Sequence, residues 1–132
     1  MKEDSSIIKE INLDASVVSL RSDGIIQIFM KPNLTMNKND GKQIVDALAN
    51  IGGGAKFPIL FIAGSFTLAN TEARQYAASE EANQYTLASA FVVNNIAQKL
   101  MGQAYVSFNH PITPTRILTS EEDAVTWLKT FL

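Results

Sequence analysis

Pro58-Ile59-Leu60-Phe61-Ile62-Ala63 is an uninterrupted apolar run, and it points most directly to the architecture of this 132-residue chain. A second largely apolar run, Leu87–Val93, follows it after a polar segment. Strands that are covered by helices on both faces lose the alternation of apolar and polar residues, so they read as continuous apolar runs. We therefore predict that both runs form buried strands in a helix-covered sheet.

The N-terminal part of the chain has the pattern of a β-hairpin. Two runs rich in β-branched residues, 15–21 and 25–30, flank Ser22-Asp23-Gly24, and an Asp-Gly pair favours a tight turn between antiparallel strands. Residues 1–9 are expected to form a flexible arm, and an edge strand is expected to begin at Ile11 and Leu13. Because a single domain usually has about 100–150 residues, we predict one domain over residues 10–132.

Four further segments have apolar residues at helical spacing. Gly52-Gly53-Gly54 ends the first helix, and because this run precedes a strand it lacks the order of a phosphate-binding loop. The expected helices span 37–51 and 72–79, run from Asn94 or Asn95 towards Phe108, and follow a capping box at Thr119-Ser120-Glu121-Glu122. In the third helix, the residues expected to face inward are Ile96, Ala97, Leu100, Met101, Ala104 and Phe108.

A hairpin followed by alternating helices and strands predicts an α/β fold. Helical crossovers between strands of one sheet force parallel pairing in right-handed units, whereas the hairpin adds antiparallel pairs. We expect a single-layer mixed β-sheet, made of the N-terminal hairpin plus parallel strands and covered by about four helices.

The composition excludes several classes of function. The chain has 11 basic and 13 acidic residues, so its net charge of −2 gives no general attraction for nucleic acid. It has no cysteine, which excludes disulfides and thiolate metal sites. Its one histidine, His110, cannot supply the two or three imidazoles of a typical catalytic zinc site. We therefore expect no metal and no cofactor.

The N-terminus is charged, and no apolar segment approaches the ~20 residues that a membrane-spanning helix needs. We expect a cytoplasmic protein that does not insert into membranes.

Several local patterns resemble those of a known group of proteins. The patterns are Thr71-Glu72-Ala73-Arg74, the strand end at Ala88–Asn94, Ile96-Ala97-Gln98-Lys99-Leu100, Asn109-His110-Pro111 and the ending Glu121–Leu128. Over roughly residues 15–131, the chain resembles an uncharacterised bacterial STAS/SEC14-like family related to the anti-sigma-factor antagonist (SpoIIAA-like) domains. The resemblance implies a STAS/SpoIIAA-like fold and no established activity.

The resemblance also implies a place for a phosphorylation switch. The antagonist domains are phosphorylated on a Ser of an Asp-Ser-Ser-Gly motif at a helix N-terminus, and the comparable place here reads Asn70-Thr71-Glu72-Ala73. The Thr71 hydroxyl could accept the phosphate, but the second Ser and the Gly are absent and Glu72 would repel it. Asn70 or Thr71 caps the helix that follows. We interpret Thr71 as a plain cap residue and keep its phosphorylation as the alternative.

Two loops are candidates for ligand binding, because ligands of open α/β sheets bind beyond the carboxyl ends of the strands. The first loop carries Ser65 and Thr67 and leads to Arg74; the second is Asn94-Asn95 at a helix start. Hydroxyls, amides and one guanidinium together suit a small anion. The alternative is structural: Ser65 and Thr67 form turns, the two Asn residues cap, and Arg74 pairs with Glu72 or a nearby Asp.

Three functions are compatible with these residues. The leading hypothesis is a non-enzymatic regulatory module that contacts a protein partner or itself as a homodimer. The second is a domain that binds a small anionic or lipid-like ligand near Ser65, Arg74 and Asn94, and it predicts a concave pocket there. The third is a hydrolase that uses Ser65 or Thr67 with His110.

Overall fold

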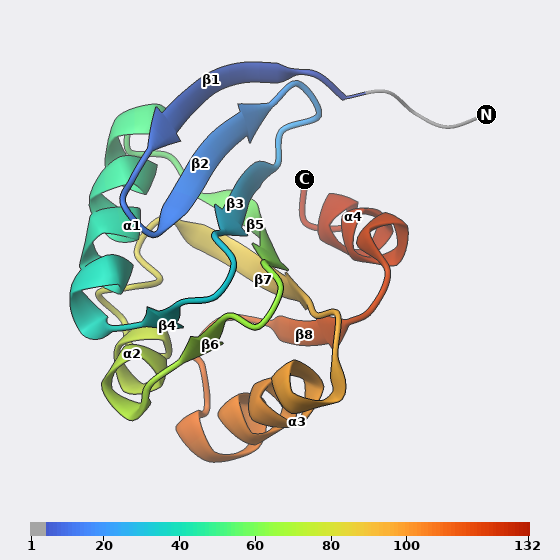
Figure 1. Cartoon of the computed structure of the whole chain (residues 1–132). Helices are drawn as coiled ribbons and strands as arrows, with labels where there is room; N and C mark the ends of the chain where they lie inside the picture. The colour runs from blue at the N-terminus through green and yellow to red at the C-terminus, as the bar shows by residue number, and fades with distance from the viewer. Residues whose placement is uncertain (1–4) are drawn as a thin grey trace.

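The computed structural model describes residues 5–132, which form a six-stranded mixed sheet with helices on both faces (Figure 1). This confirms the predicted fold class. In chain order the elements are β1 (Ile7–Asn12), β2 (Ser16–Arg21), β3 (Ile26–Met30), β4 (Thr35–Met36), α1 (Lys38–Ile51), β5 (Phe57–Ala63), β6 (Leu68–Ala69), α2 (Thr71–Ala77), β7 (Thr86–Val92), α3 (Ile96–Ala104), the π-helical turn η1 (Tyr105–Asn109), β8 (Thr115–Leu118) and α4 (Glu121–Lys129).

The strand order is β1-β2-β3-β5-β7-β8. The pairs β1–β2 and β2–β3 are antiparallel, and β3, β5, β7 and β8 run parallel to one another. β4 and β6 form a separate two-stranded parallel pair below the carboxyl ends of β3 and β5 (Figure 1). The two apolar runs are therefore neighbouring strands, β5 and β7, inside the sheet.

The N-terminal strand begins earlier than the sequence predicts. Residues 7–9, expected in a flexible arm, belong to β1, where Ile7 pairs with Arg21 of β2. Ile7 and Ile8 are 47% and 59% exposed, so backbone pairing and not side-chain burial holds this part of the strand. Residues 1–4 of the predicted arm lie outside the described residues.

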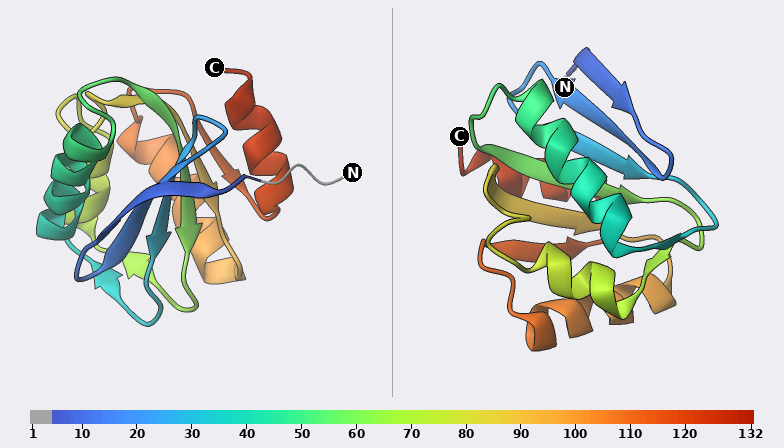
Figure 2. Two further views of the ribbon diagram at one scale, coloured as in Figure 1. Left: turned by 90° about the horizontal axis from the view of Figure 1, so that it is seen from above. Right: turned by 90° about the vertical axis from the view of Figure 1, so that its left-hand side faces the viewer.

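Two hydrophobic layers enclose the sheet. α1 packs on one face with Ile28 and Ile59, whereas α4 packs on the opposite face with Leu60 and Ala90. Figure 2 shows α1 and α2 on one side of the sheet and α4 on the other. The alternation of Ile59 and Leu60 between the two layers explains why β5 is apolar at every position.

Side-chain caps fix where the helices begin. Asn37 makes a capping box with Asp40 at the start of α1, and Asn95 accepts a hydrogen bond from the Gln98 amide at 2.8 Å at the start of α3. The N-cap of α4 lies one residue after the one that the predicted capping box uses. Ser120, not Thr119, is the N-cap, and its hydroxyl accepts from the Asp123 amide at 3.1 Å.

The orientation predicted for α3 is wrong for its largest residues. Ile96, Leu100 and Phe108 are 69%, 58% and 81% exposed, whereas Gln98 and Tyr105 are buried. Because both sides of α3 carry apolar residues, the spacing of apolar residues alone predicts burial for the side that is in fact exposed. No helix formed by residues 5–132 combines the length and apolar character needed to cross a bilayer.

Candidate functional site

A cavity of about 140 Å³ lies between the sheet and the helices α1, α2 and α3. Its floor is a row of side chains on three neighbouring parallel strands, where Phe61 of β5 is paired with Phe91 of β7 and Phe91 with Ile117 of β8. Met30, at the carboxyl end of β3, extends the lining. The cavity therefore lies in the same layer as the core between the sheet and α1, at a place where side chains leave space above the strands.

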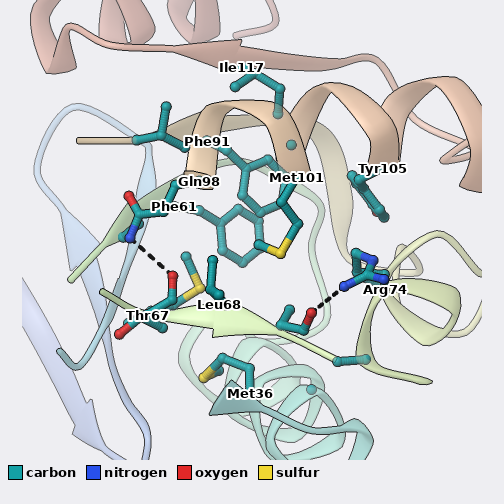
Figure 3. A pocket seen from close by; sticks show the side chains of 18 of the residues that line it. Met36, Phe61, Thr67, Leu68, Arg74, Phe91, Gln98, Met101, Tyr105 and Ile117 are labelled. Atoms are coloured by element: carbon teal, nitrogen blue, oxygen red, sulfur yellow. Dashed lines mark hydrogen bonds between the residues drawn. The ribbon is translucent and has the colours of Figure 1, made fainter. Parts of the chain in front are cut away.

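The wall of the cavity is aromatic and sulfur-rich. The rings of Phe61 and Phe91 stack with centroids 4.4 Å apart, and Tyr105 meets Phe91 edge to face at 5.9 Å. Met36 and Met101 complete the surface shown in Figure 3. Methionine thioethers are flexible and make favourable contacts with aromatic rings, so this wall suits a flat apolar guest.

Gln98 fastens the loop after β5 to the start of α3. Its Nε2 donates to the carbonyls of Gly64 and Thr67 at 2.9 and 3.0 Å, and its Oε1 accepts from the Asn94 amide at 3.0 Å. Gln98 is 2% exposed, so burial is tolerated only because the whole amide is paired. This network closes one end of the cavity, beside Thr67 (Figure 3).

The loop itself depends on a glycine at position 64. A Cβ added there would collide with the Met30 carbonyl and lie 2.6 Å from the Pro32 nitrogen. The Gly64 amide donates to the Met30 carbonyl at 2.8 Å. The close approach of two backbones at the ends of β3 and β5 therefore excludes any side chain at this position.

Arg74 is the charged member of the cavity lining among residues 5–132. Its Nη1 donates to the Ala69 carbonyl, and its Nη2 lies 3.4 Å from the Thr71 hydroxyl. The predicted alternative, a pair with Glu72 or an aspartate, is wrong: within residues 5–132 the ion pair formed by arginine joins Arg21 to Asp23. A half-buried guanidinium thus faces the cavity without a counter-charge from the described residues.

Tyr105 begins η1, the π-helical turn that ends at the left-handed His110 (φ 51°). Burial raises the pKa of Tyr105 well above its ordinary value, so the phenol keeps its proton at neutral pH. Every fully buried side-chain polar atom in the described residues has a hydrogen-bond partner. The Tyr105 hydroxyl has none there, so its oxygen retains accessible surface.

The structure separates the five predicted ligand-binding residues. Thr67 and Arg74 line the cavity. Ser65 is exposed and outside it, whereas Asn94 and Asn95 border a different, shallow depression with Lys99 and Thr119.

The polar groups of three of these residues are structurally engaged. Thr67 donates its hydroxyl to the Lys31 carbonyl, Asn94 Nδ2 donates to the Ala63 carbonyl at 2.8 Å, and Asn95 is a helix cap. Because these polar groups already bind other parts of the protein, the arrangement does not favour a shared anion site.

The remaining candidates lie outside the cavity. Thr71 is exposed as the first residue of α2, and the cap of that helix is Asn70, whose side chain accepts from the Ala73 amide at 2.9 Å. Of the two caps that the sequence allows, Asn70 and Thr71, the structure therefore has Asn70. His110 is exposed beyond η1 and does not line the cavity with Thr67.

Sequence reasoning missed the residues that make the cavity. Phe61 and Phe91 were recognised as strand residues, but nothing in a strand pattern indicates that the space above them is unfilled. Met101 was expected to face inward and does, whereas Gln98 was not singled out. The one available signal is the position of three of the four methionines: Met30 ends a predicted strand, Met36 follows it, and Met101 lies in the helix after the second apolar run.

The mixed sheet, with its antiparallel N-terminal part, parallel central strands and helices on both faces, matches a solved structure that has a SpoIIAA-like fold. The chain is similar to an uncharacterised protein of the DUF3478 family with a SpoIIAA-like fold from Shewanella loihica PV-4. The likeness has a TM-score of 0.55 at 12% sequence identity, and it covers 97% of this chain and 98% of the other. At that identity the similarity establishes the fold.

The family is established by sequence. Residues 18–132 match the model of a domain of unknown function, DUF7793, and the chain belongs to this family. No curated protein matches the chain significantly.

Proposed function

We propose that this chain is a non-enzymatic binding module that takes up a small apolar molecule between its sheet and α1–α3. The proposal rests on one observation, the aromatic cavity at the carboxyl ends of β3, β5 and β7. It shares Arg74 and Thr67 with the predicted ligand-binding residues, but Ser65 and Asn94 lie outside it and its lining is far more apolar than an anion site. The amide of Gln98 and the hydroxyl of Thr67 serve the protein's own backbone, which supports binding over catalysis.

The cavity is lined almost entirely by apolar side chains, so filling it is favourable. Protein interiors are packed about as densely as organic crystals, and an empty cavity destabilises the fold by about 24 cal/mol per Å³. A fully enclosed void of 140 Å³ corresponds to about 3 kcal/mol on that scale, which is an upper bound for this cavity because it is partly open to solvent. A ligand in this space would gain apolar contacts with Phe61, Phe91 and the methionine side chains that line it.

The size of the cavity limits the ligand. An engineered apolar cavity of roughly 150 Å³ in another protein binds benzene, whereas drug-sized molecules occupy roughly 300–1,000 Å³. The ligand proposed here therefore has an apolar body of about one benzene ring, stacked beside Phe61 and Phe91.

Toluene is a suitable first probe because it matches this body and carries no polar group. We expect it to shift the amide resonances of residues on both sides of the cavity, such as Phe91 and Met101, in heteronuclear NMR spectra. At about 100 times its dissociation constant it should raise the free energy of unfolding by about 2.7 kcal/mol.

Filling the cavity with a side chain provides the matched test. Ala73 lines the cavity from α2, whereas Ala55 is exposed in the loop before β5. Ala73→Leu should abolish toluene binding, and Ala55→Leu, which adds the same atoms outside the cavity, should leave it unchanged. Toluene shifts that persist in Ala73→Leu, or are absent from the unmodified protein, would contradict the proposal.

A second candidate function is contact with a second copy of this chain through the outer face of α3. Ile96 and Leu100 lie one helical turn apart and are both mostly exposed, and Phe108 lies beyond them. Rows of side chains four residues apart interdigitate when two such helices cross. A dimer in native mass spectrometry that is lost in Leu100→Lys would support this contact; a monomer at every concentration would contradict it.

A further inference from the structure

The cavity is apolar along its body but polar at one end. Figure 3 shows Arg74 and Tyr105 on the same side of the aromatic wall, away from Thr67 and Gln98. α2, which carries Arg74, packs against η1, which begins with Tyr105. The two side chains that line this end thus come from two elements in contact.

Both side chains are hydrogen-bond donors with capacity to spare. A guanidinium has five N–H groups, and the Arg74 bonds to Ala69 and Thr71 use one from each terminal nitrogen. The Tyr105 hydroxyl has no partner among residues 5–132 and retains accessible surface. The ligand group that best satisfies two donors, one of them a cation, is an anion with two oxygens.

We propose that the molecule taken up by the cavity is a small carboxylic acid, with its apolar body against Phe61 and Phe91 and its carboxylate bound by Arg74 and Tyr105. This inference rests on the proposed function and specifies its ligand. An aromatic acid of benzoate size fits both parts, because the body matches the cavity and the carboxylate projects towards the polar end.

The shape of the site explains why a carboxylate is preferred to other polar groups. A carboxylate neutralises the Arg74 charge, which has no acidic partner among residues 5–132. Charge-assisted hydrogen bonds in partly buried surroundings are roughly twice as strong as neutral ones. An ammonium in the same position would be repelled by the guanidinium, and a methyl group would leave it unpaired.

Three molecules of nearly equal size isolate the charge. Benzoate is anionic, toluene is neutral and benzylamine is cationic at pH 7, so their dissociation constants can be compared directly by NMR titration. We expect benzoate to bind about tenfold or more tightly than toluene, and benzylamine to bind more weakly than toluene.

Variants at the polar end locate the effect. Arg74→Gln should weaken benzoate binding about tenfold or more and leave toluene binding unchanged. Tyr105→Phe should weaken benzoate binding several-fold by the same reasoning. Arg116→Gln is the matched control: Arg116 is exposed on β8 and its guanidinium lies 5.2 Å from the Trp127 ring centroid, so it removes the same charge outside the cavity.

The outcomes separate the two proposals. If toluene binds but benzoate binds no better, or if Arg74→Gln and Arg116→Gln weaken benzoate equally, the carboxylate inference is overturned while the cavity proposal stands. If none of the three molecules binds the unmodified protein, the proposed function itself fails. Should Arg74→Gln fold poorly by circular dichroism, Tyr105→Phe and the benzoate–benzylamine comparison still decide the matter.

Discussion

Gln98 shows how a single polar side chain shapes an apolar site. Its amide makes three hydrogen bonds, to Gly64, Thr67 and Asn94, and its side chain also lines the cavity. An apolar residue here would fit the surroundings by polarity alone, but it would leave the Thr67 carbonyl and the Asn94 amide unpaired and the Gly64 carbonyl with the Thr67 amide as its remaining partner. The loop that closes the cavity is therefore held by hydrogen bonds and not by hydrophobic contacts.

Gln98→Leu should lower the free energy of unfolding by about 3 kcal/mol, because each buried polar group left unpaired costs about 1–3 kcal/mol. Urea denaturation followed by circular dichroism measures this change. Gln103→Leu, on the same helix but exposed, should stay within about 0.5 kcal/mol of the unmodified protein. Equal effects of the two substitutions would contradict the role assigned to the Gln98 amide.

Tyr105 links the stability of the protein to alkaline pH. Burial raises its pKa in the folded state above the ordinary value of 10.0, so the native state holds the phenolic proton more tightly than the unfolded state does. The stabilisation is complete below pH 10 and is lost as the pH rises towards the folded pKa. Tyr76 adds to the same trend, because desolvation and its hydrogen bond to Glu81 raise its pKa as well.

We expect the free energy of unfolding to fall above pH 10, and to fall less steeply in Tyr105→Phe than in the unmodified protein. Chemical denaturation at pH 8, 10 and 11 provides the comparison. Tyr85→Phe is the control, because the tyrosine at that position lies outside the cavity. A slope that is the same in Tyr105→Phe and the unmodified protein would show that Tyr105 does not contribute to this pH dependence.

At the scale of elements, α4 shows that a sequence motif can predict a helix correctly and still place its N-cap one residue too early. Thr119 and Ser120 are both good N-cap residues, and Glu122 and Asp123 each stand three positions after one of them. The structure selects Ser120, since β8 ends at Leu118 and the chain must turn before the helix begins. The local sequence is thus compatible with an N-cap at either residue, and the position at which β8 ends determines which of them is used.

Ser120→Ala should destabilise the protein by about 1 kcal/mol, since it removes the oxygen that accepts the Asp123 amide. Thr119→Ala should have little effect, because the exposed Thr119 side chain does not cap the helix. Thermal unfolding of the two variants side by side measures the difference. A larger loss of stability in Thr119→Ala than in Ser120→Ala would contradict this assignment and indicate that Thr119 is the N-cap.

At the scale of the whole molecule, the two hydrophobic layers share one sheet. β5 contributes Ile59 to the layer under α1 and Leu60 to the layer under α4, so neither layer can come apart without disturbing the strand between them. The cavity lies in the first of these layers. Its stability is therefore tied to contacts on the far face of the sheet.

The shared sheet predicts a single cooperative unfolding transition. The only tryptophan, Trp127, lies on α4 and reports the second layer by fluorescence, whereas circular dichroism reports the whole fold. The two signals should give the same denaturation midpoint. Leu128→Ala, which truncates a fully buried α4 side chain, should lower both midpoints together and cost about 3 kcal/mol. Separate midpoints would mean that α4 unfolds independently.

The sequence by itself determined the layers of this protein. The apolar runs at β5 and β7, the Asp23-Gly24 turn and the helix-cap residues specify which elements form and in what order, because burial, turn geometry and capping are local properties with a period or a motif. The α/β class and the mixed sheet followed from that order.

Only the tertiary structure decided where the site lies. Whether Phe61 and Phe91 touch a helix or border a void depends on the combined volume of side chains from several elements, and hydrophobic periodicity carries no information about volume. The same holds for α3, where Gln98 faces inward because its partners are carbonyls of a distant loop and Leu100 is left exposed. The spacing of apolar residues indicates which residues favour burial, but the packing of segments distant in sequence determines which residues are buried and what they contact.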